Sequence, residues 1–142
     1  MPVLFILDDD ASLLLALQYW FQTKGYEVHV FISSLKLLDA LKKRKPDFIL
    51  IDVYLTRREH GGDLCFYLKK QLRLSCPIYL FSSSPLSYSQ FCEYKADGFL
   101  LKRASFTELT KIVSSCILNK NNDEGVMADA SVDGNNKSEY YV

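Results

Sequence analysis

The sequence lacks the features that mark several common classes of protein. It has no excess of one charge, since 17 basic residues balance 17 acidic ones, and this balance argues against a protein held on nucleic acid by a general basic surface. No stretch approaches the roughly 20 consecutive apolar residues of a membrane span. The 4 cysteines include no CxxC pair, so a zinc cluster is not expected. These absences predict a protein without direct nucleic-acid contact and without membrane insertion.

The sequence also lacks a secretory signal. Its first apolar run, Val3–Leu7, is followed at once by Asp8, Asp9 and Asp10, which a signal peptide would not carry at that place. We therefore expect a cytoplasmic protein. An even number of cysteines permits two disulfides, but each cysteine lies in or beside an apolar run, which favours free, buried thiols. These residues are Cys65, Cys76, Cys92 and Cys116.

The chain of 142 residues suits one domain of ordinary size, and its apolar fraction of 49% is typical of a globular protein. Charge is unevenly distributed, since residues 1–118 hold 15 basic and 12 acidic side chains and residues 119–142 hold 2 basic and 5 acidic ones. The second segment has little apolar periodicity. We expect a folded domain over residues 1–118 and a flexible acidic tail over 119–142, with no separate output domain.

Five short apolar runs alternate with helical patterns along the folded part. The runs are Val3–Leu7, Val28–Ile32, Phe48–Ile51, Ile78–Phe81 and Phe99–Leu101. The first expected helix follows Asp10 and stops at Gly25. The others cover about Ser33–Lys43, Gly62–Arg73, Leu86–Tyr94 and Ser105–Leu118. Strict alternation of strand and helix with short connections predicts a doubly wound α/β domain around a parallel sheet.

Polar side chains follow four of the expected strands. Asp8 and Asp9 come after the first strand, and Asp52, Ser82 and Lys102 close the third, fourth and fifth. The carboxyl ends of the strands form the ligand-binding edge of such a sheet. Clustered carboxylates repel one another unless a cation neutralises them, and oxygen-only ligands favour Mg²⁺. An aspartate beside this metal is a competent nucleophile toward phosphorus, with the hydroxyl and the ammonium holding phosphoryl oxygens.

Each of these residues also has a simple structural alternative. Asp9 or Asp10 could cap the first helix, and Asp52 could be an ordinary strand-end residue. Ser82 could satisfy a loop backbone group, and Lys102 could be a solvated surface charge. Separate structural roles do not explain why these residues converge on one edge of the sheet, so we favour a functional site.

Four segments carry a resemblance to a known family. They are ILDDDASLLLALQYWFQTKGYEV, PDFILIDVYL, PIYLFSSS and KADGFLLKRASFTEL. In this order they resemble the acidic pair with the first helix, the phosphoacceptor strand, the strand with the switch hydroxyl, and the last strand with its aromatic residue and lysine. Over residues 2–118 the chain thus resembles the response regulator receiver domain of two-component signalling, including chemotaxis regulators. The resemblance implies a flavodoxin-like fold of five helices and five parallel strands in the order 2-1-3-4-5.

The resemblance implies a role for each residue of the site. Asp52 matches the phosphoacceptor, Ser82 matches the hydroxyl that is drawn toward the phosphoryl group, and Lys102 matches the lysine that pairs with it. Phe99 matches the aromatic residue whose rotamer follows the switch. The implied Mg²⁺ ligands are Asp9, Asp8 through water, Asp52 and the backbone carbonyl of Tyr54.

The resemblance also implies a function and partners. A sensor histidine kinase or a phosphotransfer protein would donate phosphate to Asp52, and the domain, as a monomer or weak homodimer, would then engage a downstream protein. Its catalysis would be limited to self-catalysed phosphotransfer and autodephosphorylation. The main alternative is a pseudo-receiver, which binds proteins without being phosphorylated. A haloacid-dehalogenase-like phosphatase and a flavin-binding protein are less well supported, because Tyr54 replaces the second aspartate of the phosphatase motif and acids occupy the first turn.

The loop after the phosphoacceptor departs from the family pattern. The segment VYLTRREHGGDL lacks the usual proline and is one or two residues longer. It brings Arg57, Arg58 and His60 near the site, where they either attract an anionic partner or form a solvated loop tip. Tyr54 is large for its position, and we expect it to hinder attack by water and to lengthen the life of the aspartyl phosphate.

Two further departures concern the last strand. Arg103 stands where the family has a cis proline, and we expect a trans peptide bond there because a cis bond without proline costs roughly 2.5–4 kcal/mol. Phe99 replaces a frequent tyrosine, which removes a hydroxyl but keeps a ring able to change its rotamer.

Overall fold

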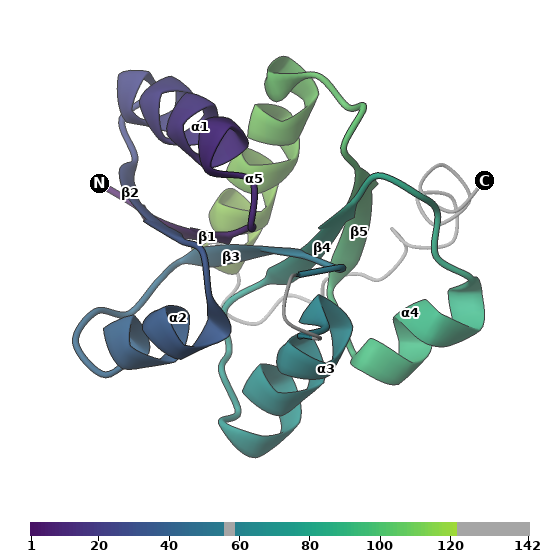
Figure 1. Cartoon of the computed structure of the whole chain (residues 1–142). Helices are drawn as coiled ribbons and strands as arrows, with labels where there is room; N and C mark the ends of the chain where they lie inside the picture. The colour runs from purple at the N-terminus through teal and green to yellow at the C-terminus, as the bar shows by residue number, and fades with distance from the viewer. Residues whose placement is uncertain (56–58, 122–142) are drawn as a thin grey trace.

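The computed structural model describes residues 1–55 and 59–121. Its central layer is a five-stranded sheet in the order β2-β1-β3-β4-β5, in which every neighbouring pair of strands is parallel (Figure 1). The strands are β1 (Val3–Leu7), β2 (Glu27–Phe31), β3 (Phe48–Asp52), β4 (Ile78–Ser82) and β5 (Gly98–Leu101). The expected α/β class and strand order are therefore confirmed.

Helices cover both faces of this sheet (Figure 1). They are α1 (Ala11–Thr23), α2 (Ser34–Leu41), α3 (Gly61–Phe66) with the π-helical turn η1 (Tyr67–Gln71), α4 (Tyr88–Tyr94) and α5 (Phe106–Asn121). Phe21 of α1 and Val113 of α5 belong to one apolar cluster. Leu37 of α2, Cys65 of α3 and Phe91 of α4 belong to a second cluster on the other face. Both faces of the sheet are thus covered, as a parallel sheet requires.

Strands β1 and β3 are buried along their whole length. Successive side chains of a strand point to opposite faces of the sheet. Phe5 therefore belongs to the cluster under α2, α3 and α4, while Leu4 and Ile6 belong to the cluster under α1 and α5. Burial on both faces explains why these strands occur in the sequence as unbroken apolar runs. Parallel strands also end at one edge, so the polar residues that follow them gather there.

Helix boundaries differ from the expected ranges at several places, and a capping signal explains the start of α4. Ser87 forms a capping box with Gln90, so α4 begins at Tyr88, while Leu86 is buried in the core ahead of it. The helix expected over 62–73 is divided, because it passes into the η1 turn after Phe66. Helix α5 continues to Asn121, three residues beyond the expected end.

The prediction of buried thiols is correct only in part. All four cysteines are free, and Cys65 and Cys76 are buried, but Cys116 is only partly covered and Cys92 is exposed. Cys92 follows the buried Phe91 on α4, and a step of one residue along a helix turns the side chain toward solvent.

Two other expectations can be compared with the described residues. No cis peptide bond occurs among them, so the bond between Lys102 and Arg103 is trans as expected. Within residues 1–55 and 59–121, no helix combines the length and the apolar character needed to cross a bilayer.

Candidate functional site

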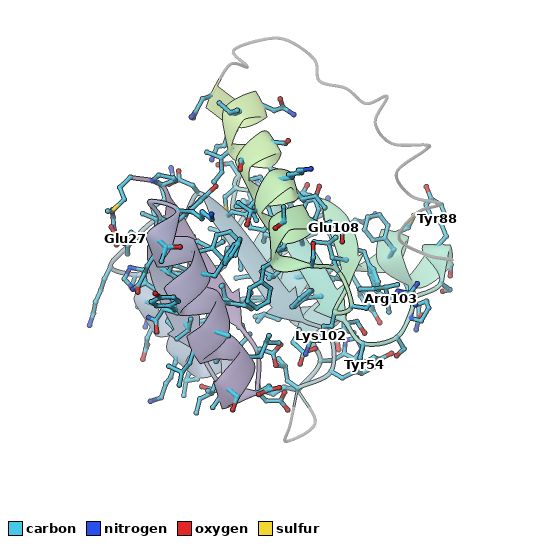
Figure 2. All side chains as sticks on the ribbon, turned by 90° about the horizontal axis from the view of Figure 1, so that it is seen from above. Glu27, Tyr54, Tyr88, Lys102, Arg103 and Glu108 are labelled. Atoms are coloured by element: carbon cyan, nitrogen blue, oxygen red, sulfur yellow. The ribbon has the colours of Figure 1, made fainter. Side chains whose placement is uncertain are left out.

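Three polar side chains are buried at the carboxyl edge of the sheet. Asp8 is 0% exposed, Asp52 4% and Ser82 0%, and among the described residues these are the only buried polar or charged ones. They follow or end the adjacent strands β1, β3 and β4. A buried polar or charged group is costly unless it is paired, so three of them on neighbouring strands mark this edge as a candidate site. Figure 2 shows Lys102 and Tyr54 toward the same end of the molecule.

Lys102 pairs with two of the carboxylates. Its Nζ lies 2.8 Å from Asp8 Oδ2 and 3.3 Å from Asp52 Oδ1. Asp8 Oδ1 accepts a hydrogen bond from the Asp10 amide at 2.9 Å. Asp8 Oδ2 is buried, and the partner that the described residues offer it is the Lys102 ammonium. With Asp9 nearby, the described residues of the site carry three carboxylates and one ammonium, and so an excess of negative charge.

Asp8, Asp9 and Asp52 form an acidic cluster that can hold a cation. One carboxylate oxygen from each lies within 4.8 Å of the others. The donor set consists of oxygen atoms, and its three carboxylates outnumber the one ammonium, that of Lys102, which the described residues place against them. Both properties fit Mg²⁺, which prefers carboxylate oxygens and keeps several of its waters.

Burial and neighbouring charges shift the pKa values of Asp52 and Lys102. Burial raises the pKa of Asp52 to about 6, the charge of Asp8 adds to this rise, and Lys102 opposes it. Burial alone would lower the pKa of Lys102, but its ion pairs with Asp8 and Asp52 outweigh burial and raise that pKa. At neutral pH Asp52 is therefore mainly ionised, as a nucleophile must be, and Lys102 is charged.

Ser82 and Lys102 are joined through the main chain. The Lys102 amide donates to the Ser82 carbonyl at 2.7 Å, and Ser82 Oγ accepts from the Ser84 amide at 3.2 Å. A hydroxyl that accepts in this way still has its own proton to donate. Phe99 is fully buried on β5 and belongs to the same apolar cluster as Phe91 of α4. The sequence-predicted switch residues thus lie at the end of β4 and in the core beside α4.

Asp9 and Asp10 have different roles at the start of α1. Asp10 is the N-cap, and its Oδ1 accepts from the Leu13 amide at 3.1 Å. The structural alternative of helix capping therefore holds for Asp10, whereas Asp9 lies with the acidic cluster.

The loop after Asp52 gives His60 a role that the sequence did not reveal. Residues 56–58, which include Arg57 and Arg58, lie outside the described part of the chain. His60 is the N-cap of α3, and its Nδ1 accepts from the Gly62 amide at 3.1 Å. Its ring lies edge-on to Tyr54, with 5.4 Å between ring centroids. His60 is therefore part of a packed structure. A histidine placed directly before Gly61 and Gly62 is the signal that could have indicated this cap.

Comparison with known proteins identifies the family. The profile of the response regulator receiver domain matches residues 4–114. The chain therefore belongs to the response regulator receiver domain family. Receiver domains of this kind act in two-component signalling with a histidine kinase, and they generally bind Mg²⁺ through an acidic pocket such as that of Asp8, Asp9 and Asp52. Membership leaves the phosphoacceptor switch and the pseudo-receiver as the functions to weigh.

Curated relatives include two transcriptional regulators. The chain is 27% identical to the alkaline phosphatase synthesis transcriptional regulatory protein PhoP of Bacillus subtilis, over 80% of this chain and 48% of the relative. It is 25% identical to the DNA-binding response regulator MtrA of Mycobacterium tuberculosis, over 92% of this chain and 58% of the relative. The chain thus spans about half the length of the curated relatives that it matches.

Solved structures share the fold. A CheY-like receiver domain protein from Methanospirillum hungatei superimposes with a TM-score of 0.78 at 19% identity, covering 88% of this chain and 99% of that one. The chemotaxis protein CheY4 of Vibrio cholerae superimposes with a TM-score of 0.74 at 22% identity, covering 82% of this chain and 98% of that one.

Proposed function

We propose that this receiver domain is a Mg²⁺-dependent phosphoacceptor switch that is phosphorylated on Asp52. The observation that carries the proposal is the burial of Asp8 and Asp52 around the ammonium of Lys102, at the edge where adjacent strands end. A structural site would gain little from an excess of buried negative charge. A site that receives a cation and a phosphoryl group uses this excess directly.

The proposed reaction is transfer of a phosphoryl group to the Asp52 carboxylate. An Asp52 oxygen forms the new bond to phosphorus, while the bond to the donor breaks and the electron pair leaves with the donor, a kinase phosphohistidine or a small acyl phosphate. Asp8, Asp9, Asp52 and the Tyr54 carbonyl would hold Mg²⁺, whose charge offsets that of the phosphoryl oxygens. Lys102 would pair with a phosphoryl oxygen, and Ser82 would donate its hydroxyl proton to another.

The proposed switch follows from the charge that the phosphoryl group brings. It adds close to two negative charges and strong acceptors, which draw Ser82 and Lys102 away from their present partners. A shift of Ser82 would leave room for Phe99, which lies in the cluster beside α4, to change its rotamer. A protein partner would then recognise the altered surface near α4, β5 and α5.

We further propose that residues 1–118 act as the receiver unit and 119–142 as an acidic tail, in a monomer or weak homodimer. The four free thiols fit the reducing cytoplasm, where we place the exchange with a histidine kinase or phosphotransfer protein. The alternative is a pseudo-receiver, favoured by the altered loop after Asp52 and by Arg103 in place of a proline.

One experiment separates the two functions. The protein is incubated with Mg²⁺ and acetyl phosphate, and its intact mass is measured beside that of Asp52→Asn. The switch predicts a phosphoryl adduct on the wild type that is lost without Mg²⁺ and absent from the variant. No adduct on the wild type, or an equal adduct on both proteins, would favour the pseudo-receiver.

A further inference from the structure

The main chain on either side of Tyr54 is tied to the residues that precede α3. Tyr54 and His60 form an isolated antiparallel bridge. The Leu55 amide donates to the Glu59 carbonyl at 3.3 Å, and the Gly61 amide donates to the Val53 carbonyl at 2.7 Å. This bridge fixes the backbone that carries the Tyr54 carbonyl, which is the backbone ligand in the proposed metal site.

Three aromatic rings are in successive contact beside this bridge. The His60 ring contacts two others: Tyr54, at 5.4 Å, and Tyr94 of α4, at 5.2 Å, measured between ring centroids. Tyr54 is about half exposed, at 52%, and its ring contacts that of His60 edge-on. The far ring, Tyr94, belongs to α4, which packs beside α3 (Figure 1).

Two glycines allow this close packing. A Cβ on Gly61 would lie 2.0 Å from the main-chain oxygen of Asp52, and a Cβ on Gly62 would lie 2.6 Å from the ring of Tyr94. The start of α3 therefore presses directly against the backbone of the proposed phosphoacceptor on one side and against Tyr94 on the other. His60 precedes both glycines and caps the helix that they begin.

We propose that His60 is a positioning residue for the site, and that it acts through its ring. In contact with both Tyr54 and Tyr94, the ring keeps the bridge at Tyr54 closed and so directs the Tyr54 carbonyl toward the cation site. The inference rests on the proposed function, in which the Tyr54 carbonyl is a ligand of Mg²⁺. The role assigned to His60 is not that of a ligand, because it acts through Tyr54.

Two variants separate the ring of His60 from its cap. His60→Asn keeps a side-chain oxygen that can accept from the Gly62 amide but removes the ring. His60→Phe keeps a ring beside the two tyrosines but cannot accept that hydrogen bond. If the ring positions the loop, His60→Asn should weaken both the bridge at Tyr54 and the binding of Mg²⁺. His60→Phe should leave both nearly unchanged.

The first measurement uses the metal-free protein. Amide hydrogen exchange is followed by NMR at Leu55 and Gly61, which donate the two bonds of the bridge. Each aromatic pair is worth about a two- to tenfold change in an opening equilibrium, so exchange at both amides should be about tenfold faster or more in His60→Asn. In His60→Phe these amides should exchange at nearly the wild-type rate, while the uncapped Gly62 amide should exchange faster.

The second measurement is the affinity for Mg²⁺ by calorimetry. Loss of a residue that orients a metal ligand weakens binding by about tenfold or more, and we expect this of His60→Asn but not of His60→Phe. Tyr94→Leu removes one ring pair and should weaken binding less than His60→Asn does. The matched control is Tyr88→Leu at the other end of α4, where Tyr88 stacks on Phe91, and it should leave affinity unchanged.

The outcomes are distinct from those that test the proposed function. A wild type that binds no Mg²⁺ would refute the metal site, while the exchange rates would still decide whether the ring holds the bridge. Unchanged exchange at Leu55 and Gly61 in His60→Asn would overturn the proposal. So would equal acceleration in both variants, since the cap alone would then explain it. Faster exchange with undiminished Mg²⁺ affinity would overturn the link between His60 and the site.

Discussion

The acidic cluster should make the metal-free protein less stable than a variant without the Asp52 charge. Burial, followed by the charge of Asp8, raises the pKa of Asp52 from 3.8 to about 6 on folding. A carboxyl group whose pKa is higher in the folded chain favours folding in its protonated form. This contribution is complete below the unfolded pKa and is lost as the pH rises from about 4 to about 6. Above that range the folded protein carries the full cost of an ionised, buried carboxylate.

The size of this cost follows from the pKa change. A rise of about two pKa units corresponds to about 3 kcal/mol. This free energy already includes the attraction between Asp52 and Lys102, because that attraction contributes to the pKa of Asp52 in the folded protein. An asparagine in the same place must find partners for its amide, which offsets part of the gain. We therefore expect Asp52→Asn to raise the free energy of unfolding by about 1–3 kcal/mol near neutral pH and by little near pH 4.

The assay is urea unfolding of both proteins with EDTA present, near pH 7.5 and near pH 4. The matched control is Asp39→Asn, an exposed aspartate in a weak ion pair with Lys42, which should change stability by less than about 0.5 kcal/mol. A variant Asp52→Asn that is less stable than the wild type near neutral pH would refute the reasoning. An equal gain at both pH values would also refute it, because the gain would then not come from the charge.

Two further predictions concern the neighbourhood of Asp52. Gly61→Ala places a Cβ 2.0 Å from the Asp52 carbonyl oxygen, so it should lower the free energy of unfolding by about 2–3 kcal/mol or more. The control is Gly25→Ala, at a positive φ with no atom within 4 Å, which should lower the free energy of unfolding by about 1 kcal/mol through backbone strain alone. If urea unfolding shows a loss for Gly61→Ala that is equal to or smaller than the loss for Gly25→Ala, the close packing at Gly61 is contradicted. Tyr54→Ala should shorten the lifetime of the aspartyl phosphate, measured as the decay of the phosphoryl adduct by mass spectrometry. A lifetime as long as that of the wild type would show that Tyr54 does not hinder attack by water.

The fold and the members of the site could be predicted because both depend on short-range patterns. Strands such as β1 and β3 are buried on both faces and appear as unbroken apolar runs. A polar residue directly after such a run, such as Asp8 or Ser82, lies at the carboxyl edge of a parallel sheet. Topology then brings these residues together without any knowledge of the loops.

The remaining features depend on tertiary contacts that no local pattern encodes. The ring of His60 is ordered by Tyr54 and by Tyr94 of a different helix, so a loop position alone does not reveal its role. The exposure of Cys92 depends on how α4 turns against the core, and an apolar neighbour such as Phe91 does not fix it. The raised pKa of Asp52 likewise requires the burial that only the folded chain provides.

The central claim, that Asp52 receives the phosphoryl group, can be tested at a single residue. The protein is treated with acetyl phosphate and Mg²⁺ and then with sodium borohydride, which reduces an aspartyl phosphate to homoserine, and the peptides are sequenced by tandem mass spectrometry. We predict homoserine at position 52 and at no other aspartate, and none when Mg²⁺ is replaced by EDTA. Homoserine at Asp8 or Asp9, or its absence from every peptide, would contradict the assignment of Asp52 as the phosphoacceptor.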